Sequence, residues 1–253
     1  TLKNNKGYIN YQYVIIDEYQ DISLQRYNFT KKISDLFKAK IIAVGDDWQT
    51  IFSFSGSDIE LFTKFYESMG YAEITTITKT YRNSQELINL AGEFIQKNNA
   101  QLKKQLLSDK HMAKPVVIIK YNYDEKEDDL PKKLEYLIGK INYQNNNHKI
   151  LLLTRFNDEI YNLLSSKLFY KTKENDTKIV CKKYPEVCID IMTVHKSKGL
   201  GYDQVILLNS LNIIKGFPSQ LKDEEVIKLI KGNNNIEEYI EYPEERRLFY
   251  VAL

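Results

Sequence analysis

Several short apolar runs recur along the chain, and their continuity restricts the folds that it can adopt. The runs are rich in β-branched residues: YVIID, KIIAVGD, ITTITKT, PVVIIKY, KILLLTR, CIDIMTVH and QVILLN. Continuous rather than alternating hydrophobicity is typical of strands that are buried on both faces of a parallel sheet. Segments with helical periodicity lie between the runs, and this alternation predicts an α/β fold with parallel sheets flanked by helices.

Ser and Asp residues mark where the intervening helices are expected to begin. The segments SLQRYNFTKKISDLFK, SDIELFTKFYESMG and SQELINLAGEFIQKN each open on a side chain that can cap a helix. The polar stretch 232–245 is expected to be a loop that leads into a last helix beginning near Pro243. The polar and charged residues of 98–114 and 123–147 predict solvated helices and loops that connect sheet elements.

Size, charge and cysteine content set the outer limits. The 253 residues, 43% of them hydrophobic, exceed the usual size of one domain, which favours two α/β domains and leaves one unit open. With 36 basic and 34 acidic residues the net charge is +2, so any nucleic-acid site must be local. Cys181 and Cys188 are too few for a disulfide framework or a four-thiolate cluster. No signal peptide or long apolar span is present, which predicts a cytoplasmic protein without a membrane segment.

Carboxylates follow directly after the first apolar run, in VIIDEYQDIS (14–23). Ligands of open parallel sheets bind beyond the carboxyl ends of the strands, and Asp17 and Glu18 are expected at such an end. One carboxylate there can hold Mg²⁺ on the phosphates of a nucleotide, while its neighbour orients or deprotonates the attacking water. By itself the pattern is weak, because Asp and Glu also cap helices and occur in ordinary loops.

A second apolar run also leads into polar residues, in IIAVGDDWQTIFSFSGSD (41–58). It places Gln49 where a neutral amide can sense a phosphate or an attacking water. Trp48, Phe52 and Phe54 lie close to it, and aromatic rings beside a polar groove hold single-stranded nucleic acid by stacking, at ~1–3 kcal/mol per base. The alternative is that these rings pack in the core, and the sequence does not choose between the two interpretations.

Three further stretches carry basic or aromatic side chains between predicted elements. They are TKTYRNSQELI with Tyr81 and Arg82, IMTVHKSKGLGYDQVILL with His195, Lys196 and Lys198, and EERRLFYVAL with Arg246 and Arg247. Arginine suits the bridging of transferred phosphates, because its planar fork stays charged and stabilises the transition state. Each stretch alone would be interpreted as surface charge, but the ordered set points to phosphate chemistry.

The ordered motifs resemble those of the UvrD/Rep-like family of superfamily 1 helicases. DEYQD matches the DExx box of that family, VGDDWQTIFSFSGSD its third motif, TYRNS its fourth, TVHKSKGL its fifth and EERRLFYVAL its sixth. The GDDWQ and FSGSD wording is most similar to the DNA helicase IV branch. The resemblance implies a RecA-like P-loop NTPase fold with two domains: residues 1–81 as the C-terminal part of the first, and 82–253 as the second, truncated at the sixth motif.

The resemblance also implies an activity and a role for each motif residue. The parent would be an ATP-dependent 3′–5′ DNA helicase with ATP and Mg²⁺ as cofactors and single-stranded DNA and duplex junctions as partners. The nucleotide group comprises Asp17 on Mg²⁺, Glu18 on the attacking water, Gln49 and Arg82 near the γ-phosphate, Tyr81 on adenine and the pair Arg246 and Arg247, of which Arg247 is favoured. The DNA group comprises Trp48, Phe52, Phe54, His195 and Lys196.

Departures from the family pattern limit what is expected of this chain. No G-x-x-x-x-G-K-[ST] string is present, so the chain is expected to be inactive in ATP hydrolysis by itself. Gly201 stands where the family usually has a glutamate that contacts the nucleotide sugar. Ser53 and Ser55 stand where the family often has arginines, so DNA binding by this motif is expected to be weaker. The stretch between Arg82 and His195 is too short for the large inserted subdomain of many members.

Two other functions stay open at this point. A HelD-like ATPase resembles helicase IV but acts on RNA polymerase, and strand displacement would distinguish the two. A helicase subunit of a helicase–nuclease would carry a nuclease domain and often an iron–sulfur cysteine set, and neither is visible in this sequence. RNA polymerase and DNA-repair proteins therefore stay open as partners, and the oligomeric state is unknown.

Overall fold

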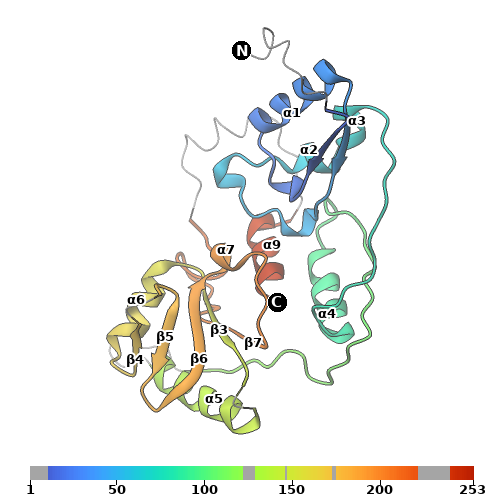
Figure 1. Ribbon diagram of the computed structural model, residues 1–253. Coiled ribbons are helices and arrows are strands. Elements are labelled where there is room, and N and C mark those ends of the chain that lie inside the picture. Colours follow the sequence, from blue (N-terminus) through green and yellow to red (C-terminus); the bar gives the residue numbers. More distant parts are fainter. Residues whose placement is uncertain (1–10, 122–128, 146, 173–174, 222–239) are drawn as a thin grey trace. The chain divides into compact units, whose positions relative to one another are not determined.

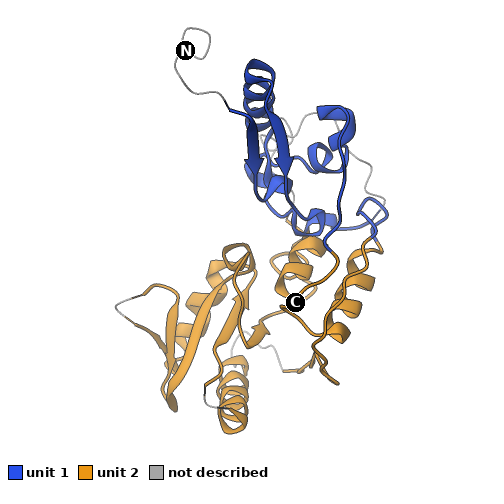
Figure 2. Cartoon of the chain, turned by 45° about the vertical axis from the view of Figure 1, so that its right-hand side comes forward, with its two compact units in different colours: residues 1–77, 98–103, 222–244 blue, residues 78–97, 104–221, 245–253 orange. Residues whose placement is uncertain are grey.

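The chain forms two units, each with its own sheet (Figure 2). The computed structural model describes residues 11–121, 129–145, 147–172, 175–221 and 240–253. The described part of the first unit comprises 11–77, 98–103 and 240–244. The rest of the described residues form the second unit.

The first unit contains two parallel strands and the helix that connects them. Strand β1 (Tyr13–Ile16) pairs with β2 (Lys40–Ala43), and Ile16 lies opposite Ala43. Helix α1 (Leu24–Phe37) begins at Ser23, whose side chain accepts the N–H of Arg26. The remaining elements are the short 3₁₀ helices η1 (Tyr19–Asp21), η2 (Asp47–Gln49) and η3 (Ser53–Ser55), and the helices α2 (Ile59–Thr63) and α3 (Phe65–Met69).

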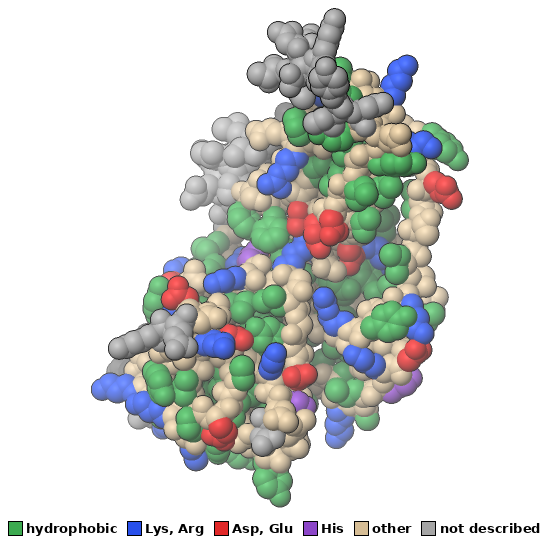
Figure 3. Space-filling model, in the orientation of Figure 1, with side chains coloured by type: hydrophobic (Ala, Val, Ile, Leu, Met, Phe, Trp, Pro, Cys, Tyr) green, Lys and Arg blue, Asp and Glu red, His purple; other side chains and the backbone are tan. Residues whose placement is uncertain are grey.

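The expectation of burial on both sheet faces is wrong for β1 and β2. Their burial alternates, and the side chains of Tyr13, Ile15 and Ile42 are 54%, 71% and 44% exposed. One face carries Ile16 and Ala43 against a core of Tyr19, Ile22 and Tyr27. Among the described residues no second layer buries the other face, so apolar side chains reach the surface there, as they do elsewhere in both units (Figure 3).

The second unit is built on a five-stranded sheet with the order β4-β5-β6-β3-β7 (Figure 1). Strands β6, β3 and β7 are parallel, whereas β4 and β5 form an antiparallel edge. The strands are β3 (Ile150–Thr154), β4 (Phe169–Lys171), β5 (Lys178–Cys181), β6 (Tyr184–Thr193) and β7 (Gln204–Leu207). The helices are α4 (Gln85–Ile95), α5 (Leu130–Gln144), α6 (Asn157–Ser165), α7 (Val194–Ser197) and α9 (Pro243–Ala252), of which α9 belongs to this unit from Glu245 onward.

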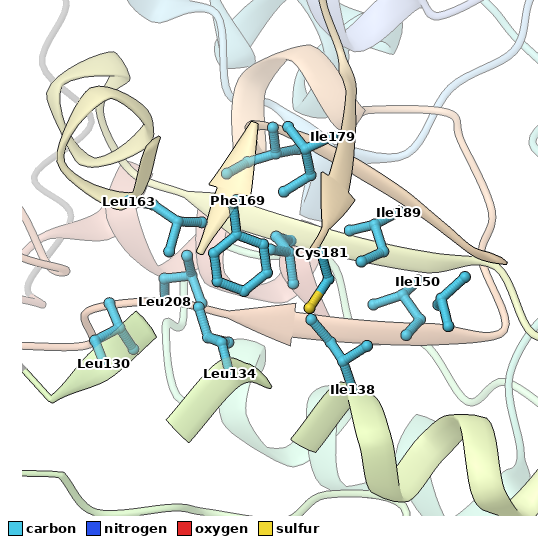
Figure 4. Packing of buried hydrophobic residues seen from close by; sticks show 13 residues of the cluster. Leu130, Leu134, Ile138, Ile150, Leu163, Phe169, Ile179, Cys181, Ile189 and Leu208 are labelled. Carbon is cyan, nitrogen blue, oxygen red and sulfur yellow. The ribbon is translucent and has the colours of Figure 1, made fainter. Parts of the chain in front are cut away.

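The core of the second unit lies between this sheet and its helices. All five residues of β3 are buried, which confirms the interpretation of KILLLTR as a strand covered on both faces. Figure 4 shows the side chains of Leu134 and Ile138 from α5 and Leu163 from α6 pointing toward those of the strands. Parallel strands flanked by helices confirm the α/β prediction for this unit.

Two apolar runs do not form the strands expected of them. Residues 74–80 and 115–121 pair with no strand, apart from an isolated bridge between Lys79 and Leu107. Ile74 is 78% exposed and Ile118 87%. A β-branched run stays a strand only where a neighbouring strand supplies a ladder and a layer covers it, and the described residues supply neither here. No helix of the described residues has the length and apolar character needed to cross a membrane.

Candidate functional site

Asp17 and Glu18 lie directly beyond the carboxyl end of β1, and both are exposed. The Oδ1 atom of Asp17 accepts the backbone N–H of Glu18 at 2.9 Å. Glu18 has a left-handed backbone with φ 51° and ψ 41°, and η1 begins immediately after it. The turn therefore holds two carboxylates side by side, at the place where parallel sheets bind ligands.

The next two residues, Tyr19 and Gln20, turn into the interior of the first unit. Both are 0% exposed. The ring of Tyr19 packs edge-on against Phe65, and its backbone N–H donates to the carbonyl of Val44 beyond β2. Burial, with a smaller contribution from Tyr27, raises the pKa of Tyr19 to about 12, so its hydroxyl stays neutral. These contacts anchor the carboxylate turn to the sheet.

Gln49 follows the neighbouring strand β2, at the same edge of the sheet. The carboxylate of Asp46 caps η2 by accepting the N–H of Trp48 at 3.1 Å, and its Oδ2 accepts Nε2 of Gln49 at 2.7 Å. Because β1 and β2 are parallel and paired in register, their carboxyl ends coincide. The first unit thus brings Asp17, Glu18 and Gln49 to one edge.

Gln20 connects these two strand ends, and the sequence did not single it out. Its Nε2 donates to Oε2 of Glu18 at 2.5 Å, and its Oε1 accepts the N–H of Asp46 at 2.9 Å. A continuous set of hydrogen bonds therefore runs from Glu18 through Gln20 and Asp46 to Gln49. In the sequence, the only signal was that Gln20 and Asp46 each follow an apolar run. Such a position does not specify a contact between the two residues.

The three aromatic residues of the third motif differ in exposure. Trp48 is 1% exposed, and its Nε1 donates to the carbonyl of Leu102 at 2.9 Å, so it packs in the core of the first unit. Its assignment to DNA is therefore corrected to packing, because a ring enclosed in this way offers no face for a base. Phe54 is 52% exposed and Phe52 is half-buried, with ring centroids 5.9 Å apart in an edge contact. Ser53, between them, donates its N–H and hydroxyl to the carboxylate of Glu244.

Tyr81 and Arg82 belong to the second unit and precede α4. Both side chains are exposed, Tyr81 by 73%. The ammonium of Lys79 lies 5.6 Å from the centroid of the Tyr81 ring. Ser84 caps α4 by accepting the N–H of Leu87, as the sequence predicted for this helix. Both side chains are therefore accessible to solvent in this unit.

His195 and Lys196 lie on α7, which continues directly from the central strand β6. His195 is half-buried and Lys196 is exposed. Gly199 then takes φ 83°, a conformation that favours glycine. Gly201 is exposed, with open space where a side chain would begin. The fifth motif thus presents its basic residues at the carboxyl end of a strand.

Arg246 and Arg247 occupy the first half of α9 in different environments. The guanidinium of Arg246 lies 5.5 Å from the ring centroid of Phe94. Arg247 is only 4% exposed. The preceding Glu245 accepts Nε and Nη2 of Arg155 at 3.0 and 2.7 Å, and it also accepts the N–H of Ser219. Arg155, which the sequence reasoning missed, follows the buried strand β3 and holds this helix.

The metal and nucleotide that the motifs imply can be tested against these residues. Mg²⁺ in nucleotide sites is often held by one or two carboxylates, with phosphates and water as the other ligands. An exposed carboxylate at a strand end, such as Asp17, fits that arrangement. The described residues contain no cluster of three or more His, Cys, Asp or Glu that could hold a metal alone. The residues present thus fit Mg²⁺ brought in by a nucleotide.

Comparison with known proteins identifies two matching family models. The UvrD/REP helicase N-terminal domain matches residues 5–70, and the UvrD-like helicase C-terminal domain matches residues 172–253. Together these matches cover more than half of the chain.

Curated relatives agree with the family models. DNA helicase IV of Escherichia coli (strain K12) is 31% identical over 96% of this chain and 32% of its own length. A probable DNA helicase II homolog of Rickettsia felis is 28% identical over 52% of this chain and 19% of its own length. ATP-dependent DNA helicase PcrA of Staphylococcus epidermidis is 32% identical over 38% of this chain and 13% of its own length. The chain spans about a third of the length of DNA helicase IV. It belongs to the UvrD/Rep-like helicase family and has the RecA-like α/β fold of that family.

Proposed function

We propose that this chain is part of an ATP-driven motor that moves 3′ to 5′ along single-stranded DNA and separates the strands of a duplex. One observation carries the proposal: the carboxylates of Asp17 and Glu18 and the amide of Gln49 follow two adjacent parallel strands at one sheet edge. That edge is where parallel sheets bind phosphorylated ligands. Membership of the UvrD/Rep-like family supports ATP-dependent DNA helicase activity in the full-length protein.

The residues of the first unit would each have a separate role in ATP hydrolysis. Bound Mg²⁺ would neutralise charge that develops on the phosphates. Asp17 would hold that ion through its exposed carboxylate, and Glu18 would orient the attacking water and accept its proton. Gln49 would contact the γ-phosphate region through its amide, and its link to Asp46 keeps that amide in place.

In the same proposal, residues of the second unit contact the nucleotide and supply positively charged side chains. Tyr81 would stack on adenine, and Arg82 and an arginine of α9 would stabilise charge on the γ-phosphate. Arg247, which the motif favours, is only 4% exposed, whereas Arg246 is half-buried, so the proposal assigns this contact to one of the two arginines without choosing between them. We propose the domain division of the family for these parts, with residues 1–81 in the first RecA-like domain and 82–253 in the second.

The proposed path of single-stranded DNA uses aromatic and basic side chains. Phe52 and Phe54 would stack on bases. His195 and Lys196, which follow the end of β6, would contact the DNA strand. Stacking tolerates any base, because every base has a π face, and this suits a motor that moves along arbitrary sequence.

A substitution of Glu18 tests the proposed chemistry. In the full-length protein, Glu18→Gln should retain nucleotide binding and lower ATP hydrolysis by at least ~10²-fold, because a positioned base is lost while the shape of the side chain is kept. Steady-state hydrolysis and binding of a non-hydrolysable ATP analogue measure the two effects. Glu67→Gln, at an exposed position on α3, is the matched control and should be silent. Near-normal turnover of the Glu18 variant would remove Glu18 from this role.

A further inference from the structure

Gln20 is a polar side chain that the first unit buries completely, with 0% of it exposed. A buried amide is costly unless its donor and acceptor groups are paired. Its two ends are paired with groups of the candidate site rather than with the surrounding core. The side chain therefore connects elements that the proposed chemistry uses.

The partners of Gln20 determine which way its amide faces. The backbone N–H of Asp46 can only donate, so the oxygen of the amide must face it, at 2.9 Å. The carboxylate Oε2 of Glu18 is the acceptor on the other side, so the NH₂ group must face it, at 2.5 Å. Flipping the amide would break both hydrogen bonds at once. Only one orientation of this side chain satisfies the site.

Packing restricts the same side chain from the β2 side. A Cβ atom on Gly45 would collide with Oε1 of Gln20 and with the ring of Phe62, so the amide lies directly against the backbone at Gly45. Asp46, the next residue, then accepts the amide of Gln49 at 2.7 Å. A shift of the segment 45–49 would therefore be transmitted to Gln20 through contact and through a hydrogen bond.

We propose that Gln20 is a positioning residue that couples the carboxylate of Glu18 to the segment that carries Gln49. The inference rests on the proposed function, in which Glu18 orients the attacking water. Glu18 is exposed, and Gln20 restricts the rotation of its carboxylate. A general base acts only within hydrogen-bond reach of the proton that it accepts, and a displacement of about 1 Å can cost about 10²-fold in rate. Movement of Gln49 would thus change the rate of hydrolysis through one amide.

The test replaces the amide by an apolar side chain of similar length in the full-length protein. Gln20→Met should lower kcat of DNA-stimulated ATP hydrolysis about 10- to 100-fold, because the base is no longer oriented. The KM for ATP should change by no more than about 3-fold, because Gln20 is not assigned any contact with the nucleotide. Gln25→Met, on the exposed face of α1, is the matched control and should leave kcat, KM and melting temperature unchanged.

A double variant separates coupling from simple packing. If Gln20 and Gln49 act through one another, Gln49→Ala should cost less rate in the Gln20→Met background than in the unmodified protein, and the cost that remains is the loss of the contact between Gln49 and the γ-phosphate. The inference is overturned if the two losses multiply, or if Gln20→Met lowers basal and stimulated rates only in proportion to the folded fraction. Gln20→Asn replaces Gln20→Met if the latter does not fold, because its shorter amide cannot reach both partners. An active Gln20→Met protein beside an inactive Glu18→Gln protein overturns this inference alone, whereas an active Glu18→Gln protein overturns the proposed function.

Discussion

Phe52 and Phe54 are the residues for which stacking on DNA and packing predict different outcomes. If the rings stack on bases, each alanine substitution in the full-length protein should weaken single-strand binding by ~1–3 kcal/mol, with little dependence on base sequence. The slope of affinity against salt should stay the same, because that slope counts phosphate contacts by cations and no cation is removed. Titrations of several oligonucleotides at several salt concentrations measure both quantities.

The control for these rings is stability. Packing predicts a lower melting temperature, with basal and DNA-stimulated ATP hydrolysis falling together in proportion to the folded fraction. Stacking predicts that stimulated hydrolysis falls further than basal hydrolysis. Phe29→Ala, at a phenylalanine on α1 that is 58% exposed, is the matched substitution and should alter neither DNA binding nor stimulation. An unchanged stimulation ratio in a destabilised Phe52 or Phe54 variant would identify these rings as core residues.

Glu159, on α6, is a residue whose titration affects stability. Burial raises its pKa to about 7, against smaller lowering effects of the N–H groups of Phe156 and Arg155, a hydrogen bond from Asn209 and the charge of Arg155. A raised pKa means that the fold favours the neutral form. The contribution of Glu159 to the free energy of unfolding is therefore complete below about pH 4.5, and it is lost as the pH rises through about 7.

The pH dependence of unfolding tests this prediction. Allowing for the exposed part of Glu159, the contribution lost between pH 5 and pH 8 is about 1–2 kcal/mol. Glu159→Gln should remove it, so the variant gains free energy of unfolding relative to the unmodified protein as the pH rises. Urea unfolding at both pH values measures the difference, with Glu93→Gln at an exposed site on α4 as control. An equal difference at both pH values would contradict the prediction.

Residues whose role follows from a strand end could be predicted from the sequence, and those that depend on distant packing could not. Asp17 and Glu18 were identified because polar residues directly followed an apolar run. Gln20 was missed because its burial depends on Gly45 and Phe62, which lie more than 20 residues further along the chain. The burial of Trp48 was missed for a similar reason, since Leu102 accepts its Nε1–H.

At the scale of elements, the bond between Arg155 and Glu245 joins strand β3 to helix α9. The side chains are only 17% and 12% exposed, and the guanidinium also lies over the ring of Phe156. Removal of one partner leaves a poorly hydrated charge, so Arg155→Met should lower the free energy of unfolding by about 2–4 kcal/mol. The double variant Arg155→Met with Glu245→Leu should lose less than Arg155→Met alone, because no unpaired charge remains.

An exposed ion pair in the same unit gives the comparison for this bond. Lys215 and Asp158 are 62% and 68% exposed, and Asp158→Asn should change the free energy of unfolding by no more than about 0.5 kcal/mol. Urea unfolding of the unmodified protein, Arg155→Met, the Arg155→Met and Glu245→Leu double variant, and Asp158→Asn measures these differences in the free energy of unfolding. Equal losses for Arg155→Met and Asp158→Asn would show that the bond to α9 contributes no more than a surface pair.

Elements with a covering layer could be predicted, whereas uncovered runs misled the sequence analysis. KILLLTR became β3 because α5, α6 and two neighbouring strands enclose it. ITTITKT has the same β-branched character, yet 74–80 lies outside both sheets. The composition of a segment indicates its strand propensity. The neighbouring strand that supplies a hydrogen-bond ladder and the layer that buries the segment come from elsewhere in the chain. The antiparallel edge of β4 and β5 was not predicted, because neither FYK nor KIVC forms part of an apolar run as long as those from which the other strands were predicted.

At the scale of the whole molecule, the chain carries several motifs of a helicase without a phosphate-binding loop. The string G-x-x-x-x-G-K-[ST] does not occur in its 253 residues. Backbone amides and a lysine of that loop form the main anion cradle of P-loop enzymes, so this chain by itself should show no measurable ATP hydrolysis and at most weak nucleotide binding. Phosphate-release assays with and without single-stranded DNA test this. DNA-stimulated hydrolysis by the chain alone would place its phosphate site elsewhere.

The left-handed backbone at Glu18 implies a conflict between thermodynamic stability and chemistry. A non-glycine residue with φ 51° is strained by about 1–2 kcal/mol, which glycine would largely avoid. Selection for stability alone would therefore favour glycine at this position. On the proposed function, the glutamate supplies a carboxylate that glycine lacks, so the local strain is the energetic cost of placing that carboxylate at the end of β1. The fold tolerates this local strain because buried residues on the following turn hold the backbone in place.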